Sequence, residues 1–162
     1  MNMDRKVYRN RILFTILTAL CVAFIFTQSL LPASASGAES GRVVDFINYL
    51  CELIGVGFTF TGHFVRKCAH FTEFAILGIS AFFTFKSYFS KYKLSALFAL
   101  TLCVAVAVSD ECLQLISAGR VCSFGDMIID SSGSAVGILI SVIFYLFLSR
   151  RNRRKKGDDY GI

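Results

Sequence analysis

The chain has 162 residues, enough for one domain, and 55% of them are hydrophobic while only 17% are charged. A mean hydropathy of +0.62, with a single proline, is typical of an integral membrane protein and excludes an ordinary soluble domain. The net charge of +6 does not indicate a nucleic-acid partner, because most basic residues flank apolar runs, as they do in membrane proteins.

The first apolar run covers residues 12–31 and follows a basic N-terminus, residues 1–11. About 20 apolar residues are enough to cross a bilayer, so this run predicts a first spanning helix. A basic start, a short apolar core and the small residues Ala33-Ser34-Ala35 are also typical of a secretory signal peptide. We favour the retained helix, and either interpretation places the next segment on the outer face.

The next segment predicts an amphipathic helix. Residues 34–41 are small and polar and offer Ser36 or Ser40 as an N-cap. Apolar residues then recur at helical spacing from Val43 to Ile54, with polar residues on the opposite face. Because the segment is too polar to span, we expect it to lie in the outer interface or to pack on the bundle.

Three further apolar runs predict three more spanning helices, at about 62–89, 94–114 and 126–149. Thirteen lysines and arginines fall on the side of the two termini and four on the other, so the positive-inside rule places both termini in the cytoplasm. The polybasic tail, residues 150–162, would be held to anionic lipid headgroups.

The expected fold is therefore all-α, an integral membrane bundle of four transmembrane helices plus one amphipathic helix on the outer face. Residues 12–149 form its transmembrane domain. The six cysteines show no CxxC pair and no zinc-site spacing, so we interpret them as small apolar side chains in or beside the helices. No cofactor is predicted, and the sequence indicates no oligomeric state.

Polar residues of the spans and loops gather in one layer at the outer side. In the second span Arg66, His70 and Glu73 share a helix face, and in the fourth Asp126 lies one turn from Asp130. The ligand-binding candidates in this layer are Arg66, Lys67, His70, Glu73, Asp110, Glu111, Gln114, Arg120, Asp126 and Asp130.

Two glycines continue the face of these aspartates toward the inner side. The spacing Gly133-x-x-x-Gly137 lets another helix approach closely, which would turn Asp126 and Asp130 toward the bundle rather than toward lipid. We therefore predict that both glycines serve helix packing.

In combination these motifs resemble the VanZ-like family of membrane proteins, over roughly residues 28–148. The elements that carry the resemblance are Arg66-Lys67 with His70 and Glu73, Asp110-Glu111-x-x-Gln114, Gly119-Arg120, and Asp126 with Gly133 and Gly137. The resemblance implies a small helical bundle in the bacterial inner membrane. The family's founding member is associated with low-level resistance to the glycopeptide teicoplanin, in a gene cluster acting on cell-wall precursors. One departure is Asp130, where the family pattern often has Asn.

The favoured function is binding or modulation of a cell-envelope ligand at the outer leaflet. Arg66, Lys67 and Arg120, together with the N-termini of the second and fourth spans, would favour a phosphate or carboxylate. At that depth the expected partners are membrane lipids, a lipid-linked wall precursor or a glycopeptide.

Two alternatives stay open. The first is a membrane-embedded enzyme for hydrolysis or group transfer on a lipid-linked substrate, using a divalent metal or acid–base groups. Its candidate residues are His70, Glu73, Asp110, Glu111 and Asp126. Because GxSxG, HExxH and P-loop motifs are absent from the sequence, we favour binding over catalysis and predict no metal. The second alternative is a structural polar network without a ligand.

Overall fold

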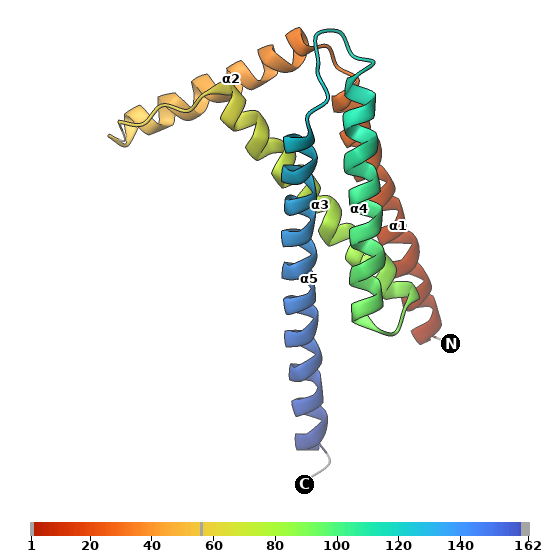
Figure 1. The fold of residues 1–162 in the computed structure, drawn as a ribbon. Helices are drawn as coiled ribbons and strands as arrows, with labels where there is room; N and C mark the ends of the chain where they lie inside the picture. Colours follow the sequence, from red (N-terminus) through yellow and green to blue (C-terminus); the bar gives the residue numbers. More distant parts are fainter. Residues whose placement is uncertain (1, 56, 160–162) are drawn as a thin grey trace.

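The computed structural model describes residues 2–55 and 57–159, and its regular elements there are all helices (Figure 1). The helices are α1 (Asn2–Ser29), α2 (Ala33–Leu53), α3 (Gly62–Tyr88), α4 (Tyr92–Gln114) and α5 (Phe124–Asp159). In this part of the chain four helices, α1, α3, α4 and α5, are long and apolar enough to span a membrane. The predicted all-α fold with four spans and one further helix is therefore confirmed.

Several helix ends differ from the predictions. The predicted N-caps of α2 are wrong, because the helix begins at Ala33 with Pro32 at the N-cap, and both Ser36 and Ser40 lie inside it. Proline suits this end of a helix since it has no N–H to leave unpaired there. Likewise α1 and α5 extend into the basic segments at the two termini, because lysine and arginine are good helix formers.

α3 is the central helix and packs against each of the other four. Both termini lie at one end of the bundle, whereas α2 and the loop 115–123 lie at the opposite end (Figure 1). We call this opposite end the polar end. α2 projects sideways from the bundle there and has no buried residue, so its apolar side chains, such as Phe46 and Leu53, stay exposed. Such a helix suits a membrane interface.

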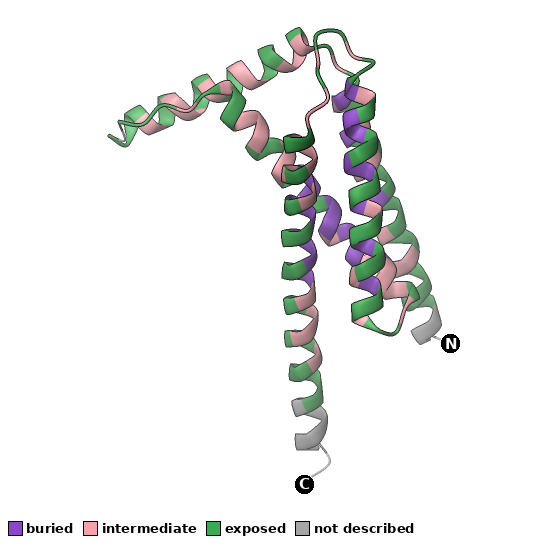
Figure 2. Cartoon of the chain, viewed as in Figure 1, coloured by how far each residue is buried: buried purple, intermediate pink, exposed green. Residues whose placement is uncertain are grey.

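The core lies around α3, where it faces α1, α4 and α5, and Figure 2 shows buried positions gathered in this part of the bundle. Phe74, Leu77 and Phe82 of α3 are fully buried. Below the polar end the core is mainly apolar, so the cost of burying charge is confined to one end of the molecule.

α3 and α5 cross with their backbones in contact. A Cβ at Gly133 would collide with the carbonyl oxygen of Phe71, and one at Gly137 with the carbonyl oxygen of Ala75. On the other side of the crossing, a Cβ at Gly78 would collide with the Ser134 carbonyl. Helices in lipid associate through such close van der Waals contact between small residues, because no hydrophobic force drives them together.

The crossing predicts that Gly137→Ala destabilises the protein. Its methyl group meets backbone, which has no rotamer to escape into, so we expect a loss of about 1–3 kcal/mol in the free energy of unfolding. The matched control is Gly41→Ala in α2, which has nothing within 4 Å of the new Cβ and should gain up to about 1 kcal/mol from helix propensity. Unfolding in detergent followed by circular dichroism measures both. Equal stabilities of the two variants would contradict this crossing.

Candidate functional site

A cavity of about 250 Å³ opens at the polar end, between α3, α4, α5 and the loop 115–123. Eight of the ten predicted ligand-binding residues line it, namely Arg66, Lys67, His70, Glu111, Gln114, Arg120, Asp126 and Asp130. We call it the first cavity. Residues from three helices and a loop thus form one polar chamber at the membrane boundary.

A second cavity, of about 210 Å³, lies on the other side of α3, beneath α2. Glu73 lines this cavity and not the first, together with Glu39 and Ser40 of α2. Arg66, His70 and Arg120 line both cavities, so these three side chains form the partition between them. Glu73 therefore lines a different cavity from Glu111 and Asp126, with which the sequence analysis grouped it.

Asp110 lines neither cavity, because it is fully buried behind the first one. The Ser29 hydroxyl at the end of α1 donates to Asp110 Oδ1, and Gln114 Nε2 donates to Asp110 Oδ2 over 3.0 Å. The Ser117 hydroxyl in turn donates to the Ser29 carbonyl over 3.0 Å. These bonds hold the carboxylate in one orientation and join α1, α4 and the following loop.

Glu111 connects α4 to the start of α5. Its Oε2 accepts a hydrogen bond from the Ser123 N–H over 2.7 Å, while its Oε1 is buried without a hydrogen-bond partner. The Ser123 hydroxyl accepts the Asp126 N–H over 3.3 Å and so caps α5. Thr61 caps α3 in the same way, accepting the Phe64 N–H over 3.3 Å. Because their own side chains occupy these amides, the two helix N-termini offer less to an anion than the sequence suggested.

The cations differ in how they are paired. Lys67 Nζ lies 3.1 Å from Asp126 Oδ1, the one ion pair among the side chains that the structure describes. Arg66 and Arg120 form no ion pair there, and Arg120 Nε is buried without a hydrogen-bond partner. Burial and, second, the positive charge of Arg66 lower the pKa of Arg120, which lies in the loop outside the spans. Two guanidinium groups thus line the cavities without an ion pair to a described side chain.

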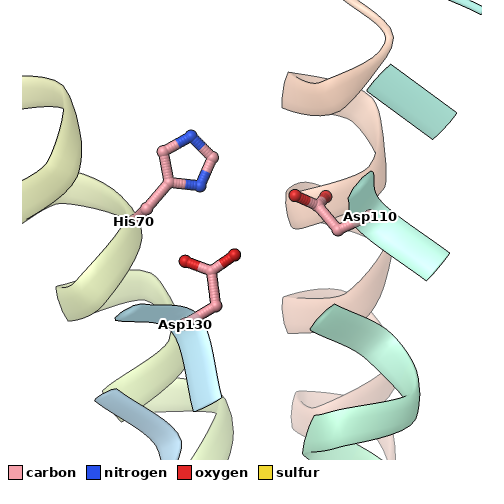
Figure 3. A group of neighbouring side chains, drawn as sticks. All are labelled: His70, Asp110 and Asp130. Carbon is pink, nitrogen blue, oxygen red and sulfur yellow. The ribbon is translucent and has the colours of Figure 1, made fainter. Parts of the chain in front are cut away.

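Three side chains from three helices converge at the wall of the first cavity. His70 of α3, Asp110 of α4 and Asp130 of α5 point toward a common point, and one ligand atom of each lies within 4.8 Å of the other two (Figure 3). Asp130 is only 1% exposed, and neither of its oxygens has a hydrogen-bond partner. The sequence grouped His70 and Asp110 with Glu73, Glu111 and Asp126 for metal or acid–base chemistry. The residue that the structure places with them is Asp130.

Sequence reasoning missed two residues of the site, Ser29 and Ser123. Ser29 has no recognisable pattern, because it ends an apolar run and meets Asp110 only through tertiary structure. Ser123 could have been found, since Ser-x-x-Asp ahead of an apolar run is the pattern of a helix N-cap.

The chain matches a family model described as VanZ/LLP1 over residues 14–145, which is most of its length. No curated protein and no solved structure matches it significantly.

The buried contact of Asp110 predicts that Ser29→Ala destabilises the protein. Loss of the hydroxyl leaves a buried carboxylate oxygen without its donor, so the free energy of unfolding should fall by about 1–3 kcal/mol. The matched control is Thr27→Ala, because this exposed hydroxyl bonds only to Ala23 of its own helix. We expect the control to stay within about 0.5 kcal/mol of the parent in detergent unfolding. Similar losses in both variants would contradict the role of Ser29.

Proposed function

The chain belongs to the VanZ/LLP1 family, and from this premise we propose that it binds the anionic group of an amphiphilic ligand at the outer leaflet of the bacterial cytoplasmic membrane. The observation that carries the proposal is the pair of guanidinium groups, Arg66 and Arg120, which line both cavities and have no ion-pair partner among the described side chains.

Two neighbouring guanidinium groups repel each other unless an anion lies between them. Arginine presents a planar fork of donors that matches a phosphate or carboxylate in two parallel hydrogen bonds. No described carboxylate forms an ion pair with either arginine; Asp126 pairs with Lys67, and Asp110 accepts from Ser29 and Gln114. An incoming anion therefore does not have to displace a carboxylate of the chain from either arginine.

The position of the chamber supports an amphiphile as the ligand. The cavities lie at the ends of spanning helices, where a headgroup can enter while its apolar part stays in the bilayer. Candidate ligands are an anionic lipid, a lipid-linked cell-wall precursor or a glycopeptide such as teicoplanin. Binding of the last two would link the protein to glycopeptide resistance.

This function predicts that Arg66→Gln and Arg120→Gln each weaken binding at least tenfold, because each removes a charge-assisted contact of roughly 1.5–3 kcal/mol. The control is Arg42→Gln, which removes an exposed arginine of α2 that lines neither cavity. Binding of phosphatidylglycerol, a polyprenyl-pyrophosphate wall precursor and teicoplanin would be measured with the protein in zwitterionic nanodiscs, which supply no competing anionic lipid. If none of these probes binds, or if all three arginine variants bind alike, the proposal is wrong.

The proposed orientation makes a second prediction, since it places both termini in the cytoplasm. Thirteen basic residues lie toward the termini and four toward the other side, an asymmetry that sets topology. Green fluorescent protein fused to the C-terminus should therefore fluoresce, and alkaline phosphatase fused at the same position should be inactive. An active phosphatase with a dark fluorescent protein would reverse the assignment.

A further inference from the structure

We propose that His70, Asp110 and Asp130 form a binding site for a divalent transition-metal ion of the Zn²⁺ or Mn²⁺ type. The three residues come from α3, α4 and α5 and meet at the wall of the first cavity (Figure 3). The site does not depend on the proposed anion binding, because its ligands are all side chains of the chain itself.

The distances suit a shared ion after small side-chain rotations. The ligand atoms lie within 4.8 Å of one another. Nitrogen and oxygen ligands of zinc lie about 2.0–2.2 Å from the ion, so two of them are at most about 4.4 Å apart. Asp130 has both oxygens free to rotate toward the common point, since no hydrogen bond holds either of them.

Charge and burial independently indicate a cation. Asp110 and Asp130 are almost completely buried, and neither forms an ion pair with a described side chain. Buried carboxylates without a counter-ion are unfavourable unless they are protonated or bind a cation. Two carboxylates and one neutral imidazole would balance the charge of a divalent ion.

The surroundings of Asp110 resemble those of a metal ligand. Ser29 and Gln114 each donate to one of its oxygens and so fix the carboxylate. Outer hydrogen bonds of this kind orient the ligands of metal sites and contribute to their affinity. The mixed nitrogen and oxygen donors favour Zn²⁺ or Mn²⁺ over Mg²⁺ and Ca²⁺, which prefer oxygen alone.

The ion would also keep coordination positions open toward the first cavity. His70 and Asp130 line this cavity, whereas Asp110 lies behind them. A phosphate or carboxylate held by Arg66 and Arg120 would then be able to coordinate the ion with one of its oxygens. Only this last step rests on the proposed function.

Metal titration of the full-length protein tests the site. The protein would be purified through a tag without histidine, stripped with a chelator and titrated with Zn²⁺ and with Mn²⁺. We expect one ion per chain, and at least tenfold weaker binding in His70→Ala and in the isosteric Asp130→Asn. The control is His63→Ala, which removes the other histidine of α3, an exposed residue outside both cavities. Absence of stoichiometric binding, or equal effects of the two histidine variants, would overturn the proposal.

A spectroscopic measurement on the unaltered protein keeps the test independent of how the variants fold. Electron spin-echo modulation of bound Mn²⁺ should show the nitrogen of a coordinated imidazole, and its absence would overturn the site. Repeating the anion titration with chelator present separates the two proposals. Weaker anion binding without the ion supports the shared site. If the protein binds no metal but the two arginine variants still bind the anion more weakly than the parent, the metal site is wrong and the anion site stands.

Discussion

The close contact between α3 and α5 is the constraint on which the site depends. Gly133 and Gly137 let α5 lie directly on the carbonyl groups of α3. Asp130 lies on this same face of α5, one turn before Gly133, so the contact carries its carboxylate to His70. A larger side chain at either glycine would separate the helices and withdraw Asp130 from His70. Packing in the apolar part of the bundle thereby determines the chemistry at its end.

The membrane imposes a second condition, because buried polar groups there cannot exchange their partners for water. The protein meets this condition with hydrogen bonds between different helices and loops. The Ser29 hydroxyl of α1 donates to Asp110 of α4, and the Ser123 N–H ahead of α5 donates to Glu111. The groups left without partners, above all Asp130 and Arg120 Nε, are of opposite charge and border the same cavity. A structural network alone does not explain why these groups stay unpaired.

Much of this arrangement could be predicted from the sequence, and the limits of the prediction have physical causes. Hydropathy reveals the four spans, and helical spacing places the polar residues at one end, because both depend on local sequence. Which of these polar residues contact one another depends on how each helix is rotated about its axis. Asp126 and Asp130 share a face, yet one pairs with Lys67 and the other faces His70. The contact between Ser29 and Asp110 could not be predicted from the sequence either, since it forms only in the folded bundle.

That contact also bears on the order of assembly. The bonds from Ser29 to Asp110 and from Ser117 to Ser29 join residues 81 and 88 positions apart. A chain made from its N-terminus delivers α1 and α2 to the bilayer long before α4 and its following loop exist. During that interval Ser29 lacks the partners it has in the finished bundle, although α1 can already pack on α3. The polar chamber is accordingly completed only when α5 enters the membrane.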